Sequence, residues 1–283
     1  MSSGPSSLSC GDETCRNRVR AARRAGLLLI GHGTRNDQGT GEFLELAGLL
    51  QQELPSTPVE ACFLELQSPD IDQAWRQLSS QGVDAIVAVP LLLFAAGHAK
   101  RDIPDALQAA CSGCSSRDRK LCFVQTDPLA CHPMLLELSE ARTQQAIESS
   151  TFPVDRARTA LVMVGRGSLD GHATAMMFRF SELRGQSFRP AVVRTGFVAM
   201  AEPKLPQVLD DVGRLPHIDT VIVQPHLLFQ GDLNQRIEQM IDEAAARFTD
   251  RRWIKAQRLG PDPQLARTLA QIAQPWLNAC PAM

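Results

Sequence analysis

The sequence has little net charge, no long apolar run and few cysteines. Its 29 Lys and Arg residues against 31 Asp and Glu give a formal charge of −2, so we expect no nucleic-acid partner. No apolar run approaches the roughly 20 residues that a helix needs to cross a bilayer, so we expect no membrane partner either. Eight cysteines are few for 283 residues and no secretory signal is evident, which favours a reducing compartment, the cytoplasm.

Residues 1–25 are rich in Ser, Gly and Arg and lack apolar periodicity. Such a composition resembles a transit peptide, but Asp12 and Glu13 count against one, because transit peptides are poor in acidic residues. We therefore expect a disordered N-terminal tail over residues 1–25.

The rest of the chain is a doubled unit. Residues 28–34 resemble residues 161–168, and Gly165 follows Gly31 by 134 positions. Residues 63–69 match residues 197–203 at the same offset. An offset this constant indicates two tandem copies, over residues 26–148 and 159–283, joined by a linker over residues 149–158.

Each copy has the pattern of four strand–helix units. Apolar, β-branched runs predict the strands, and apolar residues three and four apart predict the helices. In the first copy the strands are expected near 26–31, 58–65, 84–92 and 120–126, and the helices near 38–53, 69–80, 99–110 and 132–148. In the second copy the strands are expected near 159–165, 191–199, 219–228 and 252–258, and the helices near 171–184, 203–213, 232–247 and 262–278.

This alternation predicts an α/β protein of two tandem flavodoxin-like domains, each a four-stranded parallel sheet with helices on both faces. We expect the two domains to face one another across a cleft at the carboxyl ends of the strands. The chain would then be a monomer with pseudo-two-fold symmetry.

Two histidines of the first copy follow apolar strands. His32 stands between Gly31 and Gly33 directly after the first strand, and His98 follows the third. Ligand sites in open α/β sheets lie at the carboxyl ends of strands, and the first and third strands are commonly neighbours. Neutral imidazole binds Fe, Co, Ni and Zn and is also a base near neutral pH. The pattern therefore predicts that His32 and His98 form a metal site with open positions.

The second copy lacks both histidines. Arg166 stands in place of His32, and Asp232 in place of His98, whereas the glycines and apolar strands persist. We infer that the shared residues are architectural and that the first copy carries the chemistry.

The motifs can now be compared with a known family. They resemble the sirohydrochlorin chelatases, the class II chelatases of cobalamin and sirohaem biosynthesis, and the duplicated length resembles their long, two-domain form. The matching segments are residues 31–35, 63–67, 90–93, 97–104, 164–168 and 227–231.

The resemblance implies an enzyme that inserts Co²⁺ or Fe²⁺ into sirohydrochlorin without ATP. In that family the residues matching His32 and His98 bind the metal and help to remove pyrrole protons. Sirohydrochlorin carries carboxylates, which guanidinium and ammonium groups pair with. The cations closest in sequence to the motifs are Arg35, Lys100, Arg101 and Arg166.

One position departs from the family pattern. The family usually carries Glu where this chain has Ser68, whereas the second copy retains Glu202. An acid there would accept protons or stabilise the incoming cation. Glu65, Asp70 and Glu202 are the acids that could replace it.

Four cysteines have a spacing that resembles a metal site, either an iron–sulfur cluster or zinc: Cys111, Cys114, Cys122 and Cys131. The repeat argues against a cluster, because Cys122 falls in a strand and Cys131 at a helix start. Only Cys111 and Cys114 have no structural account.

Two other functions fit parts of the pattern. Residues 31–35 resemble the nucleophile motif of histidine phosphatases, but that motif needs Arg directly before the His, where this chain has Gly31. A non-catalytic carrier of metal or tetrapyrrole would need the same ligands as a chelatase, so the sequence leaves this alternative open, as it does the choice between cobalt and iron.

Overall fold

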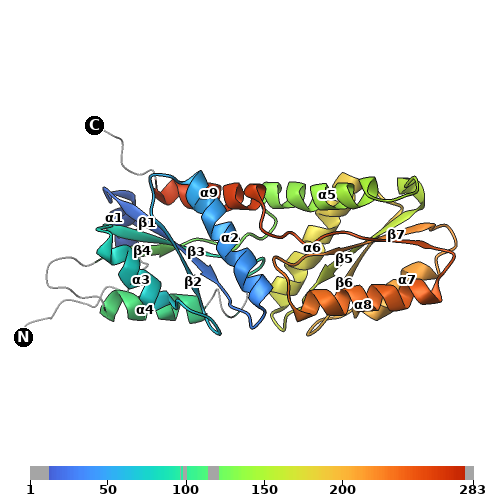
Figure 1. Ribbon diagram of the computed structural model, residues 1–283, viewed down its shortest axis with the longest axis horizontal. Coiled ribbons are helices and arrows are strands. Elements are labelled where there is room, and N and C mark those ends of the chain that lie inside the picture. The colour runs from blue at the N-terminus through green and yellow to red at the C-terminus, as the bar shows by residue number, and fades with distance from the viewer. Residues whose placement is uncertain (1–12, 96, 98–100, 114–120, 278–283) are drawn as a thin grey trace, which may run out of the picture.

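The described residues of the computed structural model, 13–95, 97, 101–113 and 121–277, form two four-stranded parallel sheets (Figure 1). The strand order is β2-β1-β3-β4 in one sheet and β6-β5-β7-β8 in the other, the order of a flavodoxin-like sheet. The predicted α/β fold class is therefore confirmed. The strands are β1 (Ala25–Gly31), β2 (Val59–Phe63), β3 (Ala85–Pro90), β4 (Cys122–Gln125), β5 (Thr159–Gly165), β6 (Val192–Phe197), β7 (Thr220–Pro225) and β8 (Arg252–Lys255).

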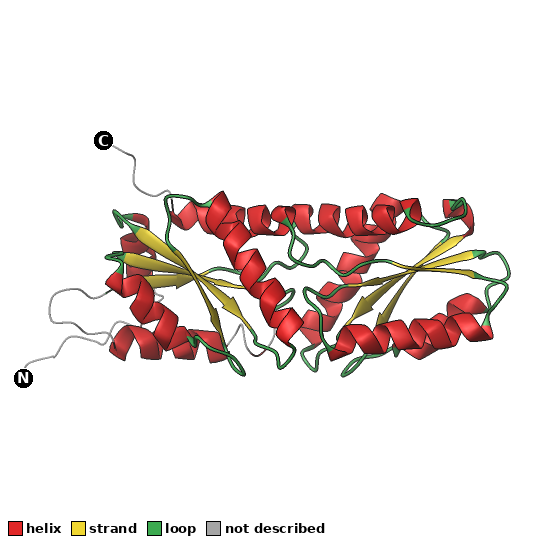
Figure 2. Cartoon of the chain, in the orientation of Figure 1, coloured by secondary structure: helices red, strands yellow, loops and turns green. Residues whose placement is uncertain are grey.

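Helices cover both faces of each sheet (Figure 2). One of them, α4, covers Ile103–Gly113 and is preceded by a π-helical turn at residues 101–102; residues 98–100 lie outside the described ranges, so the expected start near 99 stays a prediction. The helices of the two copies are α2 (Asp37–Glu53), α3 (Ile71–Ser80), α4 (Ile103–Gly113), α5 (Pro133–Glu148), α6 (Gly171–Phe188), α7 (Leu205–Gly213), α8 (Asp232–Arg247) and α9 (Pro263–Leu277).

The unbroken apolar run of β1 follows from burial on both faces of the sheet. Leu27 and Leu29 belong to one core cluster, whereas Leu28 and Ile30 belong to another. All four are fully buried. Successive side chains of a strand point to opposite faces, so a strand covered on both sides needs apolar residues at every position.

The last helices of the two copies are exchanged. Helix α9, at the end of the second copy, packs against α2, β1 and β3 of the first. Helix α5, at the end of the first copy, packs against α6 and β8 of the second. Figure 1 shows α9 beside α2 and α5 beside α6. One core cluster consequently contains residues of both copies, so neither sheet is fully covered by its own half of the chain.

A buried polar network holds α5 on the second copy. The Arg184 guanidinium in α6 is fully buried and donates to the hydroxyls of Ser139 (2.9 Å) and Thr143 (3.1 Å) in α5. Both hydroxyls also donate to the side-chain oxygen of Gln224 in β7. Burial lowers the pKa of Arg184 to about 10, against the opposing effect of the Glu140 carboxylate. Removing one partner of such a network leaves the other buried polar groups without a hydrogen bond, which costs free energy. These bonds therefore favour one placement of α5.

The N-terminal segment differs from the disordered tail expected over residues 1–25. Residues Glu13–Arg20 form a helix, α1, which packs against β3, β4 and α9. Cys15 and Val19 are 8% and 1% exposed, and four-residue spacing puts them on one face of the helix. The expectation was wrong for residues 13–25, and residues 1–12 lie outside the described ranges.

The two sheets point their carboxyl ends toward the middle of the molecule, as the strand arrows of Figure 2 show. A polar contact joins the copies there. Glu42 in α2 accepts a hydrogen bond from the backbone N–H of Gln230 (2.8 Å) and pairs with Arg258. Gly39 fits the same contact, because a Cβ on it would lie 2.4 Å from the Gln230 carbonyl oxygen. In the described part of the chain, no helix combines the length and apolarity that crossing a membrane requires.

Candidate active site

His32 lies at the carboxyl end of β1, where the sequence analysis placed it. Its side chain is 29% exposed, and its Nδ1 lies 3.5 Å from Oε1 of Glu65. Glu65 follows β2, the strand that pairs with β1 in the register Gly31–Phe63. The Glu65 N–H also donates to the His32 carbonyl oxygen at 3.1 Å. Adjacent parallel strands therefore bring an imidazole and a carboxylate to one edge of the sheet.

This contact bears on which ring nitrogen can bind a metal. A proton on Nδ1 can be donated to the carboxylate or to the Gly33 carbonyl oxygen, which lies 3.2 Å away. The lone pair of that tautomer is then on Nε2, the nitrogen that binds a metal in histidines backed by a carboxylate. Of the three acids that the sequence analysis named, Glu65 is the one that contacts His32.

The other two acids have structural partners. Asp70 is the N-cap of α3 and accepts from the Gln73 N–H at 2.8 Å. Glu202, 68% exposed, lies 3.4 Å from the ammonium of Lys204. Ser68 is exposed on the surface. The geometry thus favours Glu65 for proton handling.

Glycine after the histidine is required by the backbone. Gly33 has φ of 96°, and a Cβ on it would lie 1.8 Å from the Glu65 carbonyl oxygen. Gly167, its counterpart in the second copy, has φ of 89°, and a Cβ on it would lie 2.9 Å from the Ala201 backbone nitrogen. Only glycine adopts this conformation readily. Both copies therefore keep the glycine for architecture, as the sequence comparison predicted.

The second copy has the same backbone with different side chains. The Ala199 N–H donates to the Arg166 carbonyl oxygen at 2.9 Å, as Glu65 donates to His32. Arg166 and Ala199 thus occupy the places of the imidazole and the carboxylate. Asp232, in place of His98, is exposed at the start of α8. The imidazole–carboxylate pair is therefore absent from this copy, whose described residues include the whole of both equivalent strands.

His98 and Lys100 lie outside the described ranges, so their approach to His32 stays a prediction. The strand before them does support it. The end of β3 pairs with β1 in the register Ile30–Pro90, and the Leu91 N–H donates to the Ile30 carbonyl oxygen at 2.8 Å. The segment that carries His98 therefore leaves the sheet beside His32. Within the described ranges, no three His, Cys, Asp or Glu side chains converge on a metal position.

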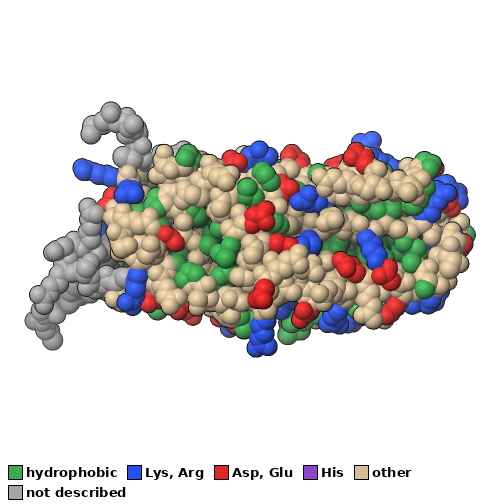
Figure 3. Space-filling model, in the orientation of Figure 1, with side chains coloured by type: hydrophobic (Ala, Val, Ile, Leu, Met, Phe, Trp, Pro, Cys, Tyr) green, Lys and Arg blue, Asp and Glu red, His purple; other side chains and the backbone are tan. Residues whose placement is uncertain are grey.

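The remaining predicted cations, Arg35, Arg101 and Arg166, are exposed. None of them forms an ion pair with another described residue, which leaves their guanidinium groups accessible to carboxylates of a ligand. Acidic and basic side chains are interspersed on the face that Figure 3 shows, in line with the small net charge.

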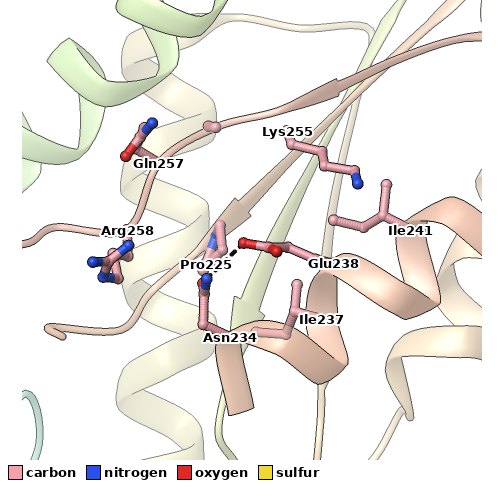
Figure 4. Close-up of a pocket in the computed structure, with 9 residues that line it drawn as sticks. Pro225, Asn234, Ile237, Glu238, Ile241, Lys255, Gln257 and Arg258 are labelled. Atoms are coloured by element: carbon pink, nitrogen blue, oxygen red, sulfur yellow. Dashed lines mark hydrogen bonds between the residues drawn. The ribbon is translucent and has the colours of Figure 1, made fainter. Parts of the chain in front are cut away.

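A pocket of about 190 Å³ lies elsewhere, between α8, the end of β7 and the segment that follows β8 (Figure 4). Four of its polar side chains are already paired: Asn234 with Glu238 at 2.7 Å, Lys255 with Asp242, and Arg258 with Glu42. None of the predicted metal or carboxylate ligands is among its lining residues. We therefore place the candidate site at the edge that carries His32.

A family model described as CbiX matches the chain twice, over residues 26–146 and 160–274. The chain belongs to the CbiX family. The two matches coincide with the two copies, and the resemblance drawn from the motifs is confirmed.

Relatives of this CbiX chain include two proteins of Priestia megaterium. A sirohydrochlorin cobaltochelatase is 27% identical over 253 residues, which are 89% of this chain and 80% of that protein. A sirohydrochlorin ferrochelatase is 28% identical over 255 residues, 89% of this chain and 91% of that protein. SirB from Bacillus subtilis with Fe³⁺ superposes with a TM-score of 0.79 at 23% identity, over 90% of this chain and 96% of that one. The last comparison shows the fold alone.

Proposed function

We propose that this protein is a sirohydrochlorin chelatase that inserts Co²⁺ or Fe²⁺ into the macrocycle without ATP, in cobalamin or sirohaem biosynthesis. The observation that carries the proposal is the His32–Glu65 pair, at 3.5 Å, which the first copy has and the second replaces with Arg166 and Ala199. Relatives named cobaltochelatase and ferrochelatase support both metals.

The reaction exchanges two pyrrole N–H protons for a divalent cation. In the proposed mechanism, His32 holds the incoming cation through Nε2, because Glu65 keeps the proton on Nδ1. Glu65, which is 51% exposed, can take the two pyrrole protons one after the other and release each to water. His98 would supply the second imidazole, as the family resemblance implies. Arg35, Lys100, Arg101 and Arg166 would pair with the macrocycle carboxylates.

We further propose that the protein acts as a monomer in the cytoplasm. The exchange of α5 and α9 supports a monomer, because it already provides each sheet with helices from the other half of the chain. The two copies, with one strand order, give such a monomer pseudo-two-fold symmetry. Sedimentation of the purified protein at micromolar concentration tests this: a dimer would contradict it.

Turnover decides between a chelatase and a carrier. Purified protein is mixed with excess sirohydrochlorin and Co²⁺, Fe²⁺ or Ni²⁺ under anaerobic conditions, without nucleotide, and the absorbance change of the macrocycle is followed. A chelatase converts many equivalents of substrate per protein, faster than the protein-free reaction. One equivalent bound without metallation would indicate a carrier and contradict the proposal.

A further inference from the structure

Two thiols contact each other at the end of the first sheet that lies away from the candidate active site. Cys15 lies in α1, and Cys122 is the first residue of β4. Their sulfur atoms are 3.6 Å apart, and the residues are 8% and 3% exposed. Cys122 begins its strand, whereas His32 follows the end of β1. The pair therefore lies at the amino ends of the strands, and metal insertion does not account for it.

The second copy has a different contact at the same place. Ala85–Cys122 in the first copy and Thr220–Arg252 in the second are equivalent pairs, each at the start of its strands. The Arg252 guanidinium lies over the Phe152 ring at 4.9 Å. Phe152 precedes β5 as Cys15 precedes β1. In both copies the segment before the first strand thus contacts the start of the edge strand, but redox chemistry is available only in the first copy.

We propose that Cys15 and Cys122 are a redox-responsive pair, whose disulfide fastens α1 to the edge strand β4. The oxidant would be a low-molecular-weight disulfide such as oxidised glutathione. The Cys15 thiolate attacks one sulfur of that disulfide and releases one thiol. The Cys122 sulfur then attacks the mixed disulfide and releases the second thiol. Two protein thiols are oxidised and one external disulfide is reduced, so electrons and protons balance.

Access to the pair requires α1 to open. Burial, followed by the Cys15 thiol beside it, raises the pKa of Cys122 to about 11, so the Cys122 thiol is a poor nucleophile while it is buried. Helix α1 has eight residues and precedes the first strand, and its inward contacts include Val19 and the Arg20 guanidinium over Trp276 at 4.8 Å. A short terminal helix opens locally far more often than the whole protein unfolds. Oxidation would then trap α1 in its closed position.

A third thiol has a different environment. Cys111 donates to the Leu121 carbonyl oxygen at 3.4 Å and belongs to the core cluster on the opposite face of the sheet from Cys15. A bond between Cys111 and Cys122 would have to cross the plane of the sheet. The geometry therefore selects Cys15 as the partner of Cys122.

Peptide mapping tests the pairing in the full chain. The reduced protein is equilibrated with defined ratios of oxidised to reduced glutathione, quenched with an alkylating reagent, digested and analysed by mass spectrometry. We expect a linked peptide that contains Cys15 and Cys122 as the main disulfide, and its loss after reduction. A different main pair, or both cysteines still alkylated when oxidised glutathione is in large excess, would overturn the proposal.

Thermal unfolding tests the consequence. The cysteines are 107 positions apart, and closing a loop of that length in the unfolded chain should raise the melting temperature by roughly 5–10 °C on oxidation. The shift should vanish in Cys15→Ser and Cys122→Ser and persist in Cys131→Ser, the matched control. An oxidation-dependent shift that survives Cys15→Ser would contradict the proposal. The mapping result on the unmodified chain stands even if Cys122→Ser fails to fold, and neither test depends on chelatase activity.

Discussion

Replacing His226 with Leu should reduce the loss of unfolding free energy that occurs as the pH falls below 6.5. His226 follows β7 and is 2% exposed, between the rings of Phe180 (4.0 Å) and Phe94 (5.3 Å). Neither ring nitrogen has a hydrogen-bond partner among the described residues. Leu91 occupies the same place in the first copy. The Leu91 N–H donates to a carbonyl oxygen of β1, and the His226 N–H donates to the equivalent carbonyl oxygen of β5. Leucine is therefore a substitution that this fold already accommodates.

Desolvation lowers the pKa of His226 from 6.5 to about 3. The folded state therefore keeps the ring neutral, while the unfolded state binds a proton below pH 6.5. Stability is at its full value above that pH and is lost as the pH falls toward 3, at about 1.4 kcal/mol per pH unit. At pH 5 the loss due to this residue is about 2 kcal/mol.

Urea unfolding at pH 7.5 and pH 5 measures the effect. The wild type should lose about 2 kcal/mol more than His226→Leu between the two pH values. The variant should also equal or exceed the wild type at pH 7.5, because it removes two buried polar atoms that have no partner. An identical pH dependence for the two proteins would refute the reasoning.

Three further substitutions test the site and the fold. Glu65→Gln should slow metal insertion by about 10- to 100-fold, because the carboxylate that orients the proposed metal ligand, His32, is lost; Glu202→Gln should leave the rate nearly unchanged, and equal losses would contradict the proposal. Gly33→Ala should cost about 2 kcal/mol or more of unfolding free energy in urea, since its Cβ meets a backbone oxygen at 1.8 Å. Gly41→Ala, with nothing within 4 Å of its Cβ, should instead gain about 0.5–1 kcal/mol. Ser139→Ala removes a partner of a buried guanidinium and should cost about 1–3 kcal/mol in the same assay; an unchanged midpoint would show that the network adds no stability.

The sequence predicted the topology because the signal was repeated. Apolar strands alternating with helices at a constant offset leave few ways to fold either copy, and in both sheets the first and third strands are neighbours, as expected for a flavodoxin-like domain. The exchange of α5 and α9 was not predicted. Helical periodicity does not say which sheet a helix covers, and long-range contacts, such as that of Arg184 with α5, decide the choice. Helix α1 escaped prediction because Cys15 and Val19 alone are too short a pattern to show periodicity.

The geometry of the candidate site could be predicted in part. His32 could be placed because a glycine-flanked histidine after a buried strand defines its own surroundings. The sequence left Glu65 as one of three candidate acids, because the contact of Glu65 with His32 depends on the register of β1 with β2. The positive φ at Gly33, which brings the two loops together, likewise becomes visible only in the structure. The position of His98 relative to His32 stays a prediction.

The most direct test of the central claim compares the two copies at one position. His32→Ala and Arg166→Ala are matched, since both change the residue that follows the central strand of a copy, and unfolding curves confirm that each is folded. We expect His32→Ala to lower the rate of Co²⁺ insertion into sirohydrochlorin by about 100-fold or more and to weaken cobalt binding measured by calorimetry. Arg166→Ala should retain cobalt binding and lose less than about 10-fold in rate. Equal losses in the two variants would contradict the claim that the first copy alone carries the chemistry.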